Sequence, residues 1–204
     1  MNHTLTLLLL GLLVTSSVAM DKWAVLVAGS KGYSNYRHQS DILHAYHVLI
    51  NGGLDPNKII VMMEDDIANN SENPYPGQVF NHPDGQDVYA GVKIDYRGSE
   101  VTPENFLAVL KGDSAATGGK PVLQSTANDD VFVYFADHGA VGLIAFPTHY
   151  LYAKDLNNAI TYMHSNGMYK NFLFYLEACE SGSMFANYLP KDKNAFALTA
   201  ANPS

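Results

Sequence analysis

The chain has 204 residues, of which 47% are apolar and 16% charged, as expected for a single ordinary globular domain. Its 20 acidic and 12 basic residues give a formal charge of −8, which excludes a generally basic surface for nucleic acid and provides no polybasic patch for a membrane. The 13 tyrosines, 9 phenylalanines and several long apolar runs argue against intrinsic disorder.

The first predicted element is an apolar run from Leu5 to Val14. It is too short to cross a bilayer, and small residues at Ser17 and Ala19 supply a cleavage site of the A-x-A type. We therefore expect residues 1–19 to be a signal peptide and residues 20–204 to form the folded domain of a protein that enters the secretory pathway. No membrane association is expected once the signal is removed.

Five apolar runs of strand length follow along the chain. They are continuous rather than alternating, which is typical of strands in a parallel sheet that is covered on both faces. The predicted strands are residues 23–28, 59–63, 131–136, 172–176 and 195–200.

Helical patterns lie between these runs. Apolar residues between Ile42 and Ile50 recur at helical spacing until Gly52-Gly53 ends the pattern. Thr102-Pro103 begins a second helix with a capping hydroxyl and a proline at the first position, and residues 156–163 form a third. Strand–helix alternation predicts a three-layer α/β fold with a mostly parallel central sheet.

Two other segments carry expectations. Residues 69–98 are rich in proline and glycine and predict a long irregular loop, in which Asn69-Asn70-Ser71 is a glycosylation acceptor. After the last predicted strand the chain ends at Ser204, so we expect the domain to be incomplete at its C-terminus, with the last strand and helix missing.

The chemistry-bearing residues follow the predicted strands. His138 comes just after residues 131–136, and Cys179 just after residues 172–176. Ligands of open α/β sheets bind at the carboxyl ends of the strands, so these two side chains are expected at one edge. Cys179 has no cysteine partner in the chain and is either an inert buried thiol, an interchain disulfide or a reactive thiol.

A cysteine and a histidine at neighbouring strand ends suit thiol-based acyl transfer. A nearby imidazolium favours the thiolate, and the same imidazole can later protonate the leaving amine. The N–H groups of Gly139 and Cys179 are candidates for an oxyanion hole.

Two blocks, residues 134–139 (YFADHG) and 177–184 (EACESGSM), resemble the signature blocks of the legumain or asparaginyl endopeptidase family of caspase-like cysteine peptidases. Further similar segments run in order from Trp23 to Ser204. Caspases use Gln-Ala-Cys where this chain has Glu177-Ala178-Cys179, and the catalytic subunit of the GPI transamidase lacks the Glu-Ala-Cys-Glu-Ser-Gly form.

The resemblance implies a caspase-like fold and a cysteine endopeptidase that cleaves after asparagine, and after aspartate at lower pH, in lysosomal or vacuolar protein processing and degradation, with the extracellular space as a further option. The implied residue roles are nucleophile for Cys179, general base and acid for His138, orientation of that histidine for Asn35, oxyanion donor for Gly139, substrate binding for Arg37, His38 and Glu177, and tuning of the site for Asp137.

The implied pocket makes chemical sense, because Arg37 can donate to the oxygen of an asparagine carboxamide and Glu177 can accept from its nitrogen. The expected partners are peptides and proteins with exposed asparagine. Neither a cofactor nor a metal is expected, since no histidine pair has ligand spacing on one helix.

Two other interpretations stay open for the gene product. It is an inactive truncated paralogue, or a transamidase of the GPI-transamidase type. A role in adhesion through Lys111-Gly112-Asp113 is a weaker idea, because a helix that ends in Lys-Gly explains the tripeptide equally well.

Overall fold

The computed structural model describes residues 21–204, so the predicted signal peptide lies outside it. Six strands form one sheet in the order β3-β2-β1-β4-β8-β9, with every neighbouring pair parallel. The strands are β1 Lys22–Ala28, β2 Ile59–Met63, β3 Tyr96–Arg97, β4 Asp130–Ala136, β8 Asn171–Glu177 and β9 Ala195–Thr199. All five predicted strands are confirmed, and β3 is an additional edge strand too short to be recognised from sequence.

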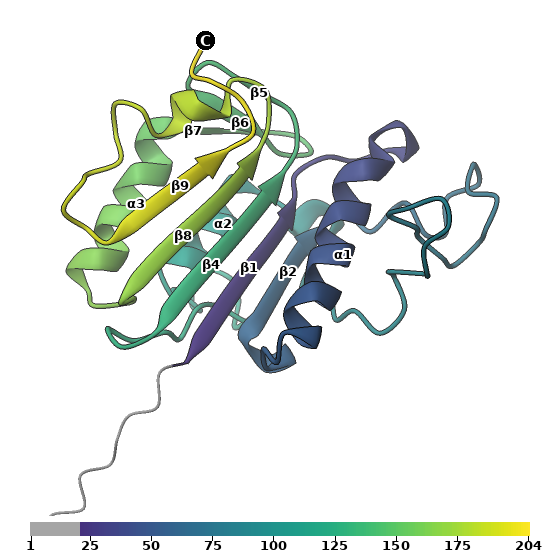
Figure 1. The fold of residues 1–204 in the computed structure, drawn as a ribbon, viewed down its shortest axis with the longest axis horizontal. Helices are drawn as coiled ribbons and strands as arrows, with labels where there is room; N and C mark the ends of the chain where they lie inside the picture. The colour runs from purple at the N-terminus through teal and green to yellow at the C-terminus, as the bar shows by residue number, and fades with distance from the viewer. Residues whose placement is uncertain (1–20) are drawn as a thin grey trace, which may run out of the picture.

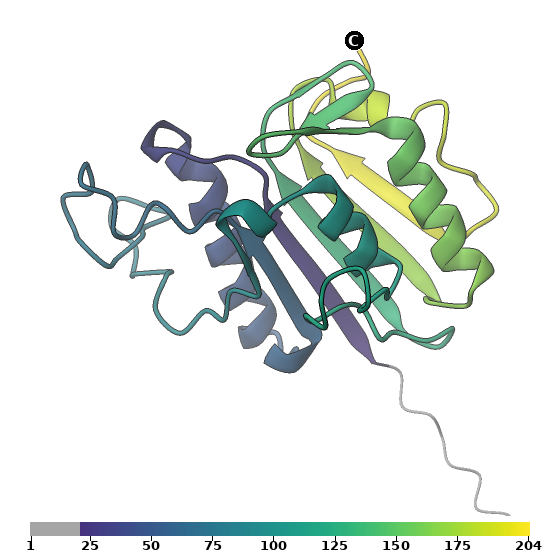
Figure 2. The same cartoon turned by 180° about the vertical axis from the view of Figure 1, so that it is seen from behind.

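Within residues 21–204, three α-helices complete the layers, which confirms the predicted three-layer α/β fold. Helix α1, Tyr36–Asn51, lies on one face of the sheet, whereas α2, Pro103–Leu110, and α3, Ala153–Ser165, lie on the other (Figures 1 and 2). The start of α2 follows the predicted pattern, because the Thr102 hydroxyl accepts a hydrogen bond of 3.2 Å from the N–H of Asn105.

A small antiparallel sheet and four 3-10 segments lie between these elements. The small sheet has the order β5-β6-β7 and stands at the carboxyl edge of the main sheet (Figure 1). Its strands have only two or three residues each, which is too short for a periodicity signal. The segments are β5 Gly139–Ala140, β6 Leu143–Ala145, β7 Tyr150–Tyr152, η1 Tyr33–Asn35, η2 Pro56–Lys58, η3 Gly98–Glu100 and η4 Ser181–Met184.

The largest core lies between the sheet and helices α2 and α3. Phe106 of α2 is fully buried, and its ring meets the rings of Phe135 on β4 and Phe174 on β8. These large aromatic groups remove much apolar surface from water and hold the carboxyl ends of β4 and β8 in a fixed relation.

On the face that carries α1, the predicted coverage of the whole sheet is wrong. Helix α1 packs on β1, β2 and β4 and leaves β8 and β9 uncovered (Figure 1). Tyr175 of β8 and Phe196 of β9 are therefore 39% and 65% exposed, although the apolar runs predicted coverage on both faces. A hollow of about 720 Å³ opens beside α1 at the amino ends of the strands, away from His138 and Cys179.

The predicted irregular loop, residues 69–98, is confirmed up to residue 95, whereas its last three residues form β3 and the start of η3. It carries a single isolated bridge, Phe80 to Asp87, within the described residues, and side chains hold it in place. The Asn73 amide donates to the carbonyls of Ile67, Ala68 and Gln78. Within residues 21–204, none of the helices combines the length and the apolar character that crossing a membrane requires.

Candidate functional site

His138 and Cys179 leave the sheet at the same level. In the parallel pairing of β4 with β8, Ala136 is opposite Glu177, so the histidine and the cysteine each lie two residues beyond a paired position. The N–H of Asp137 donates to the Glu177 carbonyl at 3.0 Å, which continues the ladder past the strand ends. Both side chains are exposed. The register therefore brings the two predicted catalytic residues to adjacent points of one edge, as expected.

The backbone turns sharply directly after Cys179. Glu180 has a left-handed conformation with φ 45°, which is uncommon for a residue with a side chain and is often found at functional sites. The Ser183 hydroxyl accepts from the N–H of Gly142 and donates to the Glu180 carbonyl. This serine ties the turn after the cysteine to the β5–β6 hairpin.

Gly139 lies against the backbone of Cys179. A Cβ at this position would be 2.6 Å from the Cys179 carbonyl oxygen, so only glycine fits without movement of the backbone. The N–H of Ala145 donates to the His138 carbonyl, which makes Gly139 a non-hydrogen-bonded position opposite Ile144. The hairpin therefore does not use the N–H of Gly139, and this group is available to a ligand.

Asn35 determines the tautomer of His138. The Asn35 side-chain N–H₂ group donates to the Lys31 carbonyl at 2.9 Å, so its Oδ1 atom is the one that faces His138 Nε2 at 2.8 Å. Because Oδ1 can only accept, Nε2 must carry the hydrogen, and in the neutral ring Nδ1 is then the basic nitrogen. Asn35 occupies the N-cap position of α1 but makes no capping bond with its side chain, which is committed to the histidine instead.

The loop that carries Asn35 is anchored to the end of β2. One carboxylate oxygen of Asp66 accepts from the N–H of Gly32 at 2.6 Å, and the other accepts from the Gln39 amide at 2.7 Å. These charge-assisted bonds fix the start of α1 relative to the sheet.

A buried polar group lies behind His138. The side chains of His38 and Asp137 are only 4% and 1% exposed, and His38 Nδ1 lies 3.3 Å from Asp137 Oδ1 and 2.7 Å from the Ser30 hydroxyl. A Cβ on Gly29 would be 2.7 Å from Asp137 Oδ2, so the glycine makes room for the carboxylate. The rings of His38 and His138 meet edge to face, with centroids 5.1 Å apart.

The predicted substrate-binding residues fall into two groups. Arg37 and Glu177 are exposed at the carboxyl edge, whereas His38 is buried. The Tyr134 hydroxyl donates to Glu177 Oε2 at 2.8 Å, and burial together with this carboxylate raises the pKa of Tyr134. The tyrosine therefore remains a neutral donor that holds one oxygen of Glu177.

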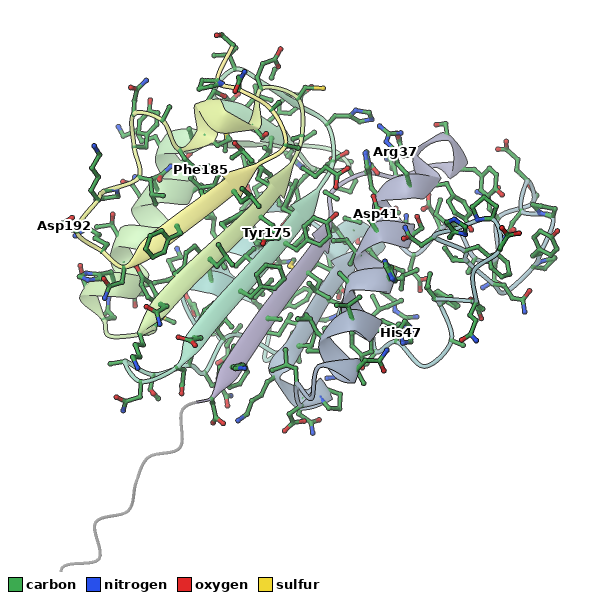
Figure 3. All side chains as sticks on the ribbon, in the orientation of Figure 1. Arg37, Asp41, His47, Tyr175, Phe185 and Asp192 are labelled. Atoms are coloured by element: carbon green, nitrogen blue, oxygen red, sulfur yellow. The ribbon has the colours of Figure 1, made fainter. Side chains whose placement is uncertain are left out.

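Asp41 lies one helical turn after Arg37 on α1, near the same end of the helix (Figure 3). Burial raises the pKa of Asp41, and a hydrogen bond of 2.6 Å from the Asn81 amide to Asp41 Oδ1 partly offsets the rise. The negative charge of Glu177 raises the pKa of Asp41 further. Asp41 was not singled out from the sequence, although its spacing of four residues from Arg37 on a predicted helix was an available signal. Tyr134 and Ser183 lie in the two signature blocks but received no role of their own from the sequence, and neither did Ser30.

The question of a bound metal concerns one group of side chains. Ligand-type atoms of His38, Asp137 and His138 lie within 4.8 Å of one another. Two of the three are buried and face each other, and His138 Nε2 is committed to Asn35. The arrangement is that of a hydrogen-bonded cluster, and we assign no metal to it.

Sequence comparisons with known proteins point to one family. The model of the peptidase C13 family matches residues 22–204. Legumain of Rattus norvegicus is 57% identical over 185 residues, which cover 89% of this chain and 42% of the relative. Hemoglobinase of Schistosoma mansoni is 58% identical over 182 residues, with 89% and 42% covered. Vacuolar-processing enzyme of Vicia sativa is 55% identical over 184 residues, with 89% and 37% covered. The chain thus spans about two fifths of the length of these curated relatives.

Proposed function

The chain belongs to the peptidase C13 family, and from that premise we propose that it acts as a cysteine endopeptidase that hydrolyses peptide bonds after asparagine. The observation that carries the proposal is the hydrogen bond of 2.8 Å between His138 and Asn35, which leaves a basic nitrogen on an exposed imidazole at the strand end next to Cys179.

The proposed reaction begins with transfer of the Cys179 thiol proton to His138 Nδ1. The thiolate then attacks the carbonyl carbon of the substrate, and the N–H of Gly139, with that of Cys179, stabilises the oxyanion. When the intermediate collapses, the imidazolium returns the proton to the leaving amine and an acyl-enzyme remains. Attack by water, again with His138 as base, releases the acid and restores the thiol.

The proposed specificity rests on two exposed side chains. Arg37 donates to the carboxamide oxygen of asparagine, and the Glu177 oxygen that Tyr134 does not hold accepts from the carboxamide nitrogen. An ionised aspartate is repelled by Glu177, so aspartate becomes a substrate only when acid protonates it. Asp137, buried beside His138, is proposed to tune the site.

The setting is also part of the proposal. The names of the plant relatives refer to vacuolar processing, and we propose a lysosomal or vacuolar role for this chain after passage through the secretory pathway. Asn69 is exposed in the long loop, which supports it as the acceptor of a glycan.

The test is cleavage of matched peptides that differ only in Asn, Gln or Asp at the position before the bond. We expect cleavage after Asn at acid and neutral pH, cleavage after Asp only at acid pH, and no cleavage after Gln. The Cys179→Ser variant should lose cleavage after both Asn and Asp while it stays folded. A folded chain that cleaves none of the peptides would contradict the proposal and favour the inactive paralogue.

A further inference from the structure

His38 is the residue whose position differs most from its expected place. A pocket wall must contact substrate, yet the imidazole of His38 is almost fully enclosed, and it contacts Asp137, Ser30 and the ring of His138. With these contacts, His38 can influence the reaction through the residues around it rather than by contact with substrate.

The carboxylate of Asp137 requires a hydrogen-bond donor. A buried charge without a partner is strongly unfavourable. Among residues 21–204, Asp137 Oδ1 makes no regular hydrogen bond, and His38 Nδ1 lies at ion-pair distance, 3.3 Å. His38 is therefore the group that can compensate the carboxylate.

The proton on His38 can be located by elimination. If Nδ1 lacked a hydrogen, the Ser30 hydroxyl would donate to it and the Asp137 carboxylate would face a lone pair in a buried site. If Nδ1 carries the hydrogen, it donates to the Ser30 oxygen and also brings the positive end of the N–H group to within 3.3 Å of Asp137 Oδ1. The second arrangement is the stable one.

This buried pair acts on His138 in two ways. Asp137 precedes His138 in the chain, and the ring of His38 meets the ring of His138 edge to face. We propose that His38 is a positioning residue: its Nδ1–H group lies beside the Asp137 carboxylate and compensates its charge, and the pair sets the orientation and the electrostatic surroundings of His138. This inference rests on the thiol chemistry of the proposed function.

Other charged groups face this cluster and must stay constant in a test. Asp41 lies on α1, and its carboxylate interacts electrostatically with His38 in the cluster, with Arg37 on the same helix and with Glu177 at the end of β8. On the exposed side, Asn35 accepts from His138 Nε2, and Cys179 follows the end of the neighbouring strand β8.

The experiment measures the rate at which iodoacetamide alkylates the chain as a function of pH. Cys179 is the only cysteine, so the rate reports directly on its thiolate. Asp137→Asn removes a negative charge beside His138, so the imidazolium is less favoured and the midpoint of the pH profile moves up. A shift of about one pH unit slows alkylation about tenfold below both midpoints. His38→Phe leaves the carboxylate uncompensated, so the midpoint moves down.

The opposite signs are the signature of the pair, because a merely structural defect would move both variants the same way. The double variant should lie between the single ones. His149→Phe and Asp84→Asn replace exposed residues of the same types and should leave the profile unchanged. If His38→Phe does not fold, His38→Leu, which also lacks a donor, takes its place and should move the midpoint in the same direction.

An unchanged midpoint in Asp137→Asn, or shifts of equal sign in both variants, would overturn the inference. Peptide cleavage separates it from the proposed function. A chain that cleaves no peptide but shows opposite shifts refutes only the function. For a chain that cleaves Asn peptides, a change confined to KM in His38→Phe would make His38 a pocket wall and overturn its positioning role.

Discussion

Phe174 and Cys179 are five residues apart on one strand and the turn that follows it, yet they lie in opposite environments. Phe174 is fully buried between the sheet and helices α2 and α3, and its ring contacts Phe106. Cys179 is exposed at the carboxyl edge, where the backbone turns at Glu180.

The difference shows how the molecule separates stability from chemistry. The strand interiors are apolar and hold the sheet together, whereas the strand ends carry groups that satisfy one another or remain available to substrate. Asp137 and His38 are the exception, because they are buried and also belong to the site.

The largest expected effect is on activity. Cys179→Ala should lower cleavage of an Asn peptide by at least about 10⁴-fold, because the nucleophile is lost. The free energy of unfolding should stay within about 0.5 kcal/mol, since the side chain is exposed. Peptide cleavage and urea unfolding measure the two quantities, and residual activity within tenfold of the parent would assign the chemistry to another group.

A substitution in the core should lower stability instead. Phe174→Ala should lower the free energy of unfolding by about 3–5 kcal/mol, because it leaves a cavity among packed aromatic rings. Tyr175→Ala is the matched control on the open face of the same strand and should cost less than about 1 kcal/mol. Equal losses in urea unfolding would mean that the open face is covered in solution.

Asn35→Ala should reduce activity about 10-fold to 100-fold, because the Nε2–H of His138 loses its acceptor and the ring loses its fixed tautomer. Ser34→Ala, at the exposed neighbouring position, is the control and should keep full activity. We expect kcat to fall and KM to stay the same in Asn35→Ala. A change confined to KM would place Asn35 in substrate binding instead.

The smallest effect concerns Asp41. Burial raises its pKa, so the folded chain holds this proton more tightly than the unfolded chain does. Stability therefore falls as pH rises from the ordinary aspartate value through the raised one. Asp41→Asn should be more stable than the parent at neutral pH, by less than about 1 kcal/mol because the group is partly exposed, and equal to it in strong acid. Thermal unfolding from about pH 3 to about pH 7 measures this, and a gain that is constant with pH would contradict the assignment.

Local patterns determined much of this protein. The five strands, the start of α2 and the placement of His138 and Cys179 at one edge of the sheet follow from apolar runs, a cap and the rule that parallel strands end at one edge. The resemblance in residues 134–139 and 177–184 is specific for the same reason, because it lies in contiguous blocks.

Contacts between distant segments were decided only by the packing of helix on sheet. Asn35 and His138 are 103 residues apart, and no periodicity links them. The burial of His38 against Asp137 depends on where α1 crosses the sheet, and so does the exposure of Tyr175. A sequence pattern records which residues are apolar and where a strand ends, but the side chains that face one another depend on the placement of whole elements, which is a property of the folded chain alone.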